Sequence, residues 1–285
     1  MDRKSKQLTR SIKKKEAGGT LVSYLQKNLH LSAKAAKIFL EKGGCRLNGV
    51  IERFGSVRLK AEDRLYVDGL AIKKPLLTRA LPLFFEDEHL LFCGKPPGIV
   101  SEQAVFTKLF NRPVFLVHRL DKETSGVMVV AKTPSMQQQL AALFKRRQVV
   151  KSYFAVVQGQ VKEETKRLCT FVAEKKRYEG QTVWQVSKSG KLAITDWRCI
   201  RRGKNKTLLQ CWPHTGRTHQ LRVHLSSQGY PILGDMQYGR HQLVHQSATR
   251  LFLHAYSLSF THPISGKKLS QIAPLPESFR GGFAS

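Results

Sequence analysis

Short apolar runs that follow one another without long helices between them most restrict how this chain can fold. From about residue 81 onward, runs rich in β-branched and aromatic residues alternate with polar or turn-forming segments, which is typical of strands. One helix stands out among them, with Thr133 as its N-cap, Pro134 in its first position, and Met136 and Leu140 on its apolar face. Because strands and helices do not alternate in a βαβ order, we predict an α+β domain with a mixed, mainly antiparallel sheet. The predicted strands cover residues 90–93, 115–117, 127–131, 153–157, 193–200 and 208–212.

A smaller unit precedes this domain. Thr20 and Ser32 are placed to cap two short amphipathic helices, the second of which runs through Lys42. Asn48-Gly49 is the strongest signal for a two-residue hairpin turn, and residues 64–67 form a last strand. We therefore divide the chain into four segments. They are a basic flexible arm over residues 1–18, a small unit over 19–70, a linker over 71–80 and the larger domain over 81–285.

The charge of the chain is strongly positive. Among 285 residues, 49 Lys and Arg oppose 20 Asp and Glu, which gives a formal net charge of +29 and favours a polyanionic partner. A membrane is the weaker choice, because no apolar run reaches the roughly 20 residues that span a bilayer and no apolar segment of a secretory signal opens the chain. Five cysteines without a CxxC pair indicate reduced thiols that act as small buried hydrophobes. We expect a cytoplasmic protein that binds nucleic acid and no membrane.

The densest group of polar side chains lies in residues 117–126, VHRLDKETSG, between two strand-like runs. The end of a strand holds a catalytic group rigidly, which makes Asp121 a candidate carboxylate. By itself, however, Asp121 is explained more simply as the cap of a turn that pairs with Arg119 or Lys122. This segment alone leaves both interpretations open.

A second polar segment, HTGRTHQLRVHL over residues 214–225, predicts a helix that Thr218 caps and that turns Leu221 and Leu225 toward the core. Arg222 then lies on a neighbouring flank, partly buried, where its guanidinium suits a carboxylate as a bidentate partner. The three histidines of this segment are spaced by five residues, which does not align ligands on a helix, so we expect no metal site.

A third segment, KSYFAVVQG, covers residues 151–159 and reads as a strand. Tyr153 within it is either an ordinary core residue or a ring on which an extruded base stacks. The segment alone favours the core residue.

Together the three segments resemble the RluA-type pseudouridine synthases. HRLDKETSG matches the catalytic motif of that family, KSYFAVVQG its tyrosine motif and HTGRTHQLRVHL its arginine motif, in the family's order. GKPPG at residues 94–98 matches the lysine-proline motif, and the later PILGD, YG, HA and HP groups also fit. The resemblance covers roughly residues 84–275 and implies an isomerase that converts uridine to pseudouridine in structured RNA.

The resemblance implies a role for each matching residue. Asp121 would be the essential carboxylate, and Arg222 would pair with it. Tyr153 would stack on the target uracil, and Arg119 would fill the space that the flipped nucleotide leaves. The other residues of these motifs that we expect to contact RNA are His118 and Lys95.

The small N-terminal unit resembles the αL RNA-binding domain that is named after a ribosomal small-subunit protein. The matching residues are Ser32, the Ala36-Lys37 step, Gly44 and the Asn48-Gly49 turn. The resemblance implies RNA contacts by basic side chains of this unit. These are Lys34, Lys37 and Arg46.

The implied reaction breaks the N1–C1′ bond of uridine and rejoins the base through C5. It needs neither a redox step nor a group donor, so we expect no cofactor, and the sequence contains neither a GxGxxG nor a GxxxxGK[ST] loop. Relatives that carry such an N-terminal domain usually act on large-subunit ribosomal RNA, which we favour over transfer RNA. We take the protein to be a monomer.

Three other functions compete with this one. A non-catalytic RNA-binding or ribosome-assembly protein would explain the charge equally well, but it would not need Asp121, Tyr153 and Arg222. An RNA methyltransferase would need a glycine loop for adenosylmethionine after a strand, and the sequence contains none. An aspartic protease is disfavoured because Lys-Glu, and not Thr/Ser-Gly, follows the aspartate.

Overall fold

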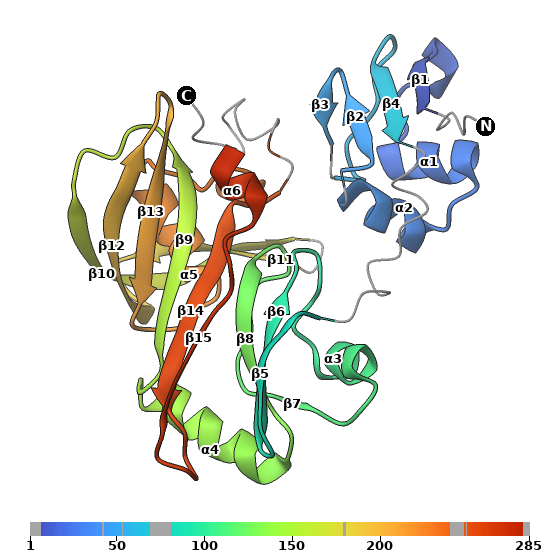
Figure 1. Ribbon diagram of the computed structural model, residues 1–285. Coiled ribbons are helices and arrows are strands. Elements are labelled where there is room, and N and C mark those ends of the chain that lie inside the picture. The colour runs from blue at the N-terminus through green and yellow to red at the C-terminus, as the bar shows by residue number, and fades with distance from the viewer. Residues whose placement is uncertain are drawn as a thin grey trace. The chain divides into compact units, whose positions relative to one another are not determined.

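Two compact units, Met1–Thr78 and Arg79–Ser285, make up the chain. The computed structural model describes residues 7–41, 43–52, 54–68, 81–178, 181–239, 248 and 250–281 (Figure 1). The predicted linker over residues 71–80 lies outside the described residues. In the described part of the chain, no helix has both the length and the apolar character that crossing a membrane requires.

The first unit is a four-stranded antiparallel sheet with two short helices. Both predicted caps are confirmed: Thr20 Oγ1 accepts a hydrogen bond from the backbone N–H of Ser23 (3.2 Å), and Ser32 Oγ accepts one from the backbone N–H of Ala35 (3.1 Å). Apolar side chains of both helices and of the sheet form one core. The elements are β1 (Gln7–Ser11), η1 (Lys14–Glu16), α1 (Leu21–Leu29), α2 (Ala33–Glu41), β2 (Cys45–Leu47), β3 (Val50–Ile51) and β4 (Arg64–Asp68), with the strands in the order β1-β4-β2-β3.

The hairpin turn predicted at Asn48-Gly49 is confirmed. The φ angles of Asn48 and Gly49 are 54° and 83°, which is the left-handed pair that a two-residue type I′ turn needs. Asn48 Oδ1 also accepts a hydrogen bond from the backbone N–H of Arg64 at 2.8 Å. The turn is thereby tied to β4, the central strand next to β2.

The flexible arm predicted over residues 1–18 is wrong for its second half. Residues Gln7–Ser11 form β1, which pairs antiparallel with β4, and Ile12 is 2% exposed in the core of the unit. Glu16 lies 3.4 Å from Arg10 and accepts a hydrogen bond from the backbone N–H of Lys13 (2.9 Å). The strand was not predicted, because a few apolar residues among many charged ones do not show the alternation that is typical of a strand.

Among the described residues, the second unit is built on an eleven-stranded sheet in which only β14 and β8 pair in parallel. The prediction of an α+β domain with a mixed, mainly antiparallel sheet is confirmed. The order along the sheet is β11-β10-β12-β13-β9-β14-β8-β6-β5, with β15 beside β14 and β7 beside β8. The strands are β5 (Leu83–Glu86), β6 (Leu90–Lys95), β7 (Phe115–Leu116), β8 (Ser125–Ala131), β9 (Val150–Gln158), β10 (Thr165–Tyr178), β11 (Gln181–Ser187), β12 (Lys191–Arg202), β13 (Lys206–Pro213), β14 (Leu253–Thr261) and β15 (Lys268–Ile272).

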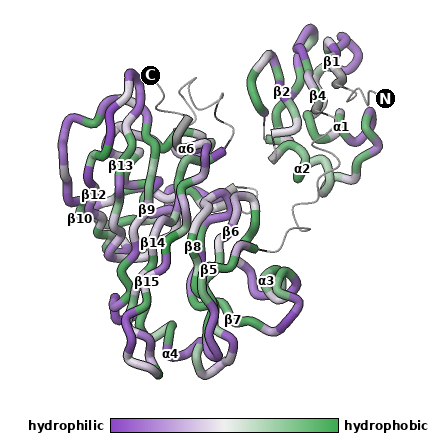
Figure 2. The backbone as a smooth tube through the Cα atoms, in the orientation of Figure 1, coloured by the Kyte–Doolittle hydropathy of each residue, from purple (hydrophilic) through white to green (hydrophobic). Residues whose placement is uncertain are grey.

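The part of this sheet that contains β6 and β8 is buried on both faces. Every residue of β6 and β8 is buried, whereas burial alternates along β12 and β13. Val127 and Val129 of β8 pack with α4 (Pro134–Lys145), and Met128 and Val130 pack with Phe106 of α3 (Gln103–Phe110). Figure 2 shows hydrophobic segments concentrated in the strands and hydrophilic ones toward the connecting loops. The loop that holds Asp121 leads directly into the buried strand β8.

The predicted helix after Thr133 is confirmed: α4 begins at Pro134, and Thr133 Oγ1 accepts a hydrogen bond from the backbone N–H of Met136 (3.2 Å). Two further helices are α5 (Gln220–Ser227) and α6 (Glu277–Gly281). Leu221 and Leu225 of α5 are buried in the core beside β9, β12 and β13, as predicted. All five cysteines are unpaired; four are buried and Cys169 is exposed, contrary to the expectation for that residue.

Candidate active site

One cavity of the second unit brings the three polar segments together. Its volume is about 500 Å³, and its lining includes Asp121, Tyr153 and Arg222. Asp121 comes from the loop between β7 and β8, Tyr153 from β9 and Arg222 from α5. Segments that are up to 101 residues apart in the chain thus converge on one site.

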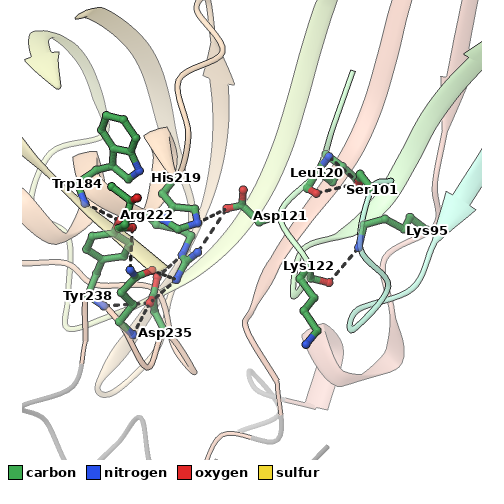
Figure 3. A network of polar contacts seen from close by, with 12 residues as sticks. Lys95, Ser101, Leu120, Asp121, Lys122, Trp184, His219, Arg222, Asp235 and Tyr238 are labelled. Carbon is green, nitrogen blue, oxygen red and sulfur yellow. Dashed lines mark hydrogen bonds and ion pairs between the residues drawn. The ribbon is translucent and has the colours of Figure 1, made fainter. Parts of the chain in front are cut away.

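The backbone on both sides of Asp121 is held by side chains of a neighbouring loop (Figure 3). Ser101 Oγ donates to the carbonyl oxygen of Leu120 (2.9 Å) and accepts from the Leu120 N–H (3.2 Å). Lys95 Nζ donates to the carbonyl oxygen of Lys122 at 3.0 Å. With both neighbours fixed, the position of the Asp121 Cα is set independently of what its carboxylate contacts.

Lys95 does not reach the cavity, so the prediction that it contacts RNA is wrong. The side chain is 1% exposed, and its ammonium also donates to the carbonyl oxygens of Pro96 (3.1 Å) and Ile99 (2.9 Å). Burial lowers the pKa of Lys95 to about 7. Its three carbonyl acceptors make Lys95 a clamp between the loop after β6 and the turn after Asp121.

His118 and Arg119 have different environments although they are adjacent. His118 Nε2 accepts a hydrogen bond from the backbone N–H of Val129 (3.0 Å), and the ring stacks on Phe144 with centroids 4.8 Å apart. Burial lowers the pKa of His118 to about 3, so the ring is neutral and anchors the loop. The half-buried His118 and the exposed Arg119 both line the cavity, and their contact with RNA stays a prediction.

Arg222 forms its bidentate pair with Asp235, not with Asp121. Its Nε and one terminal nitrogen lie 2.7 and 3.0 Å from the two carboxylate oxygens of Asp235, whose side chain is 0% exposed. The other terminal nitrogen donates a single 3.4 Å hydrogen bond to Asp121 Oδ2. Burial works against the charge of Arg222, but Asp235 and Asp121 keep its pKa above the ordinary value. Asp121 therefore keeps one oxygen unengaged by Arg222.

His219 lies on the same side of Asp121. It is the N-cap residue of α5, in the left-handed conformation with φ of 56°, so the cap predicted at Thr218 is wrong by one residue. Its Nδ1 is 2.8 Å from the hydroxyl of Tyr238, and its Nε2 is 3.9 Å from Asp121 Oδ2. Burial lowers the pKa of His219 to about 4, so the ring is neutral at neutral pH.

The hydroxyl of Tyr238 selects the tautomer of this histidine (Figure 3). Its oxygen accepts the backbone N–H of Trp184 at 3.2 Å, and we assign the hydroxyl proton to the 2.8 Å contact with His219 Nδ1. The assignment follows from the hydrogen-bond network and puts the ring proton on Nε2, which faces Asp121. The Tyr238 ring also lies 5.0 Å from the Arg222 guanidinium.

Tyr153 is fixed by the sheet. Its backbone lies opposite Cys211 of β13 on one side and Ala255 of β14 on the other, and its ring packs against two core clusters while lining the cavity. Burial raises the pKa of the Tyr153 phenol above its ordinary value. The phenol is therefore uncharged, as a ring that stacks on a base should be.

Sequence reasoning missed Asp235, His219 and Tyr238 as parts of the site. One signal was available for Asp235: a partly buried arginine on α5 needs a carboxylate, and PILGD supplies one directly after a glycine. Gly234 has φ of 77°, and a Cβ there would lie 1.9 Å from the carbonyl oxygen of Arg250. Only glycine fits, which fixes the turn that buries Asp235.

The predicted RNA-contacting residues of the first unit are described only in part. Lys37 on α2 and Arg46 on β2 are exposed, and an Arg46 terminal nitrogen lies 3.4 Å from the carbonyl oxygen of Gly49. The side chain of Lys34 lies outside the described residues. Their contact with RNA stays a prediction.

Known proteins are similar in sequence to the part of the chain that forms this cavity. The family model for RNA pseudouridylate synthase matches residues 89–227, which include Asp121, Tyr153 and Arg222. The ribosomal large subunit pseudouridine synthase C of Pasteurella multocida is 34% identical, over 93% of this chain and 89% of its own length. The ribosomal large subunit pseudouridine synthase D of Zymomonas mobilis is 33% identical, over 85% of each chain.

Solved structures agree with this placement. Human RNA pseudouridylate synthase domain containing 4 is 29% identical with a TM-score of 0.59, covering 72% of this chain and 91% of its own. Human RNA pseudouridylate synthase domain containing 1 is 25% identical with a TM-score of 0.64, covering 71% and 86%. The relatives from Pasteurella multocida and Zymomonas mobilis are named as synthases, which decides against the non-catalytic, methyltransferase and protease alternatives. The chain belongs to the RluA-type family of RNA pseudouridine synthases and is an isomerase of that class.

Proposed function

We propose that this enzyme isomerises specific uridines in large-subunit ribosomal RNA and that Asp121 is its catalytic carboxylate. The observation that carries the proposal is that Asp121 is the one carboxylate among the described residues that line the cavity. The names of the relatives from Pasteurella multocida and Zymomonas mobilis support the ribosomal target. The strongly basic chain suits a large folded RNA.

The chemistry requires an ionised carboxylate beside the ribose. When the N1–C1′ bond of uridine breaks, positive character develops on C1′ and the electron pair stays on the base. Asp121 stabilises that positive character, by direct attack or by charge, as carboxylates of glycosidases do. The single 3.4 Å hydrogen bond from Arg222 orients Asp121 and leaves an oxygen for the ribose.

The target uridine must leave its stack before it can enter the cavity. Unstacking costs a few kcal/mol, and an aromatic ring that stacks on the extruded base returns about 1–3 kcal/mol. Tyr153 supplies that ring from the wall of the cavity, and the exposed Arg119 fills the gap in the RNA. The pyrimidine is then held between Tyr153 and Asp121.

We extend the proposal to the cofactor requirement, the role of the first unit and the location of the enzyme. Isomerisation neither oxidises the base nor consumes a group donor, so the enzyme acts without a cofactor. The first unit serves as an αL RNA-binding domain through Lys34, Lys37 and Arg46, which adds phosphate contacts. The enzyme works as a monomer in the cytoplasm.

Pseudouridine mapping in cells tests the target. Carbodiimide labelling followed by primer extension on total RNA is compared between cells with the gene, without it, and with Asp121→Asn in its place. We expect at least one stop in large-subunit ribosomal RNA that is lost in both altered strains. A stop lost only from transfer RNA would overturn the target, and a stop retained with Asp121→Asn would overturn the assignment of the carboxylate.

A further inference from the structure

Lys151 is a cavity residue to which the proposed function assigns no role. It lies on β9 two residues before Tyr153, and because side chains along a strand alternate, both point to the same face, about 7 Å apart. Both line the cavity. Lys151 Nζ has one hydrogen-bond acceptor, the carbonyl oxygen of Thr215 at 3.4 Å, and no carboxylate partner among the described residues.

A cation in this position is unfavourable for the folded protein. Loss of hydration lowers the pKa of Lys151 to about 8, from an ordinary value of 10.5, and no counter-ion offsets that loss. A partly buried charge without a partner normally persists only where it serves a ligand or a reaction. The cavity, moreover, receives a substrate that becomes negatively charged.

The other charged groups of the cavity differ from Lys151 in their exposure or their partners. Arg222 is neutralised by Asp235, and Arg217 donates to the carbonyl oxygen of Leu192 at 2.9 Å. The exposed cations suit the phosphates of an RNA that rests on the opening. These exposed residues are Arg119, Lys145 and Arg147. His118 interacts electrostatically with Lys151. The other histidines of the lining are His214 and His219, and Asp121 is the one acid among the described lining residues.

We propose that the Lys151 ammonium binds a carbonyl oxygen of the flipped uracil and stabilises the negative charge that the base acquires in the reaction. The inference rests on the proposed function. When the N1–C1′ bond breaks, its electron pair stays on N1 and is shared with O2 and O4, which are the acceptors for Lys151. When C5 then bonds to C1′, the C5 proton leaves and N1 regains a proton, so that the sum is an isomerisation in which Lys151 transfers nothing.

The position of Lys151 selects the base and not a phosphate. A ring stacked on Tyr153 extends over the same face of β9, and the spacing of two residues matches the width of a pyrimidine with its exocyclic oxygen. Phosphates, in contrast, stay outside with the rest of the RNA strand. An electrostatic donor aimed at developing charge lowers the barrier more than it strengthens binding.

Single-turnover release of tritium from a large-subunit ribosomal RNA transcript labelled at C5 of uridine tests the inference. Lys151→Met keeps the aliphatic stem, Lys151→Arg keeps a charge that does not titrate below about pH 10, and Lys268→Met on the exposed β15 is the matched control. We expect Lys151→Met to lower the rate constant at saturating enzyme about 100-fold or more, with the RNA Kd changed less than about 3-fold. Lys268→Met should match the wild type.

The pH profile and the melting temperature separate this role from others. The wild-type rate should fall as the pH rises past about 8, whereas Lys151→Arg should keep part of the rate without that fall. Titration of the RNA itself affects both proteins equally. Lys151→Met should melt at the same temperature as the wild type or higher, because it removes a cation that has no carboxylate partner.

Three results would overturn the inference: an unchanged rate constant, a weakened Kd alone (a phosphate contact), or a lower melting temperature with the rate retained (a packing role). Asp121→Asn in the same assay keeps the two proposals apart. If that variant still releases tritium, the proposed role of Asp121 fails whatever Lys151 does.

Discussion

Asp121 is held in two different ways on its two sides (Figure 3). On one side, Lys95 and Ser101 bind backbone groups of the adjoining residues and leave the carboxylate alone. On the other, Arg222 and His219 approach the carboxylate itself, at 3.4 and 3.9 Å. The backbone contacts fix where the carboxylate is, and the side-chain contacts fix its orientation. Damage to the first should appear mainly in stability, and damage to the second mainly in rate.

Among the variants of the residues around Asp121, the largest effect on stability should come from Asp235→Ala. It leaves the Arg222 guanidinium buried without its bidentate partner, which should cost about 3–5 kcal/mol of unfolding free energy and lower the rate of tritium release by more than about 100-fold. The double variant Arg222→Met with Asp235→Leu should recover most of the stability and none of the activity, as chemical denaturation and the release assay will measure. A double variant as unstable as Asp235→Ala would contradict the account of the pair.

Lys95→Met should disrupt the backbone contacts on the other side of Asp121. Without the ammonium, three backbone carbonyls lose a donor, and we expect a loss of about 2–4 kcal/mol in stability. The rate at saturating RNA should fall less than it does for Asp235→Ala. An unchanged midpoint of urea unfolding would show that Lys95 does not clamp the loop.

The pH dependence of stability gives Lys95 a second signature. Its pKa of about 7 in the folded state lies below the ordinary 10.5, so the unfolded chain binds more protons between these values. The free energy of unfolding should therefore gain a rising contribution as the pH increases from about 7 toward 10, and Lys95→Met should lose it. Urea titrations at several pH values measure the slope. An equal slope in both proteins would show that this pH dependence of stability comes from a group other than Lys95.

Tyr238→Phe should have a smaller effect on the side of the carboxylate. It removes the hydroxyl that keeps the His219 proton on Nε2, so that both tautomers become populated and Asp121 loses a constant neighbour. We expect a fall of about 10-fold in the rate constant with little change in the RNA Kd, as for loss of one neutral hydrogen bond. A Tyr238→Phe enzyme that releases tritium at the wild-type rate would show that the tautomer of His219 does not affect the reaction.

The smallest effect should come from the first unit. Lys37→Ala and Arg46→Ala should each weaken RNA binding a few-fold and reduce the slope of log Kd against log salt by about 1, as loss of one phosphate contact does. The rate constant at saturation should not change. Filter binding over a range of salt concentrations measures the slope, and an unaltered slope for both variants would remove these side chains from the RNA contact.

Local signals in the sequence predicted the elements whose chemistry is local. The caps at Thr20 and Thr133 and the turn at Asn48-Gly49 depend on a few adjacent residues, and the structure has all three. β10 (Thr165–Tyr178) was not predicted, because its many charged and polar residues obscure the alternation. Pairing with β11 and β12 holds these residues in a strand although their alternation is weak.

The candidate site divides in the same way. Asp121, Tyr153 and Arg222 could be named because each lies in a motif, and the structure brings them to one cavity. The pairing of Arg222 with Asp235 could not be foreseen, since two carboxylates compete for one guanidinium and only the fold decides which is nearer. Lys95 was assigned to RNA because it lies in a matching motif, and its burial by distant segments was not visible in the sequence.

The most direct measurement is the single-turnover release of tritium from C5-labelled large-subunit ribosomal RNA by Asp121→Asn beside the wild type. Asparagine preserves the shape and the backbone contacts but removes the negative charge. We predict that the rate of tritium release falls at least about 10⁴-fold, as removal of a catalytic nucleophile typically gives. The circular dichroism spectrum and the RNA Kd should not change. An Asp121→Asn enzyme within about 10-fold of the wild type would contradict the central role of this carboxylate.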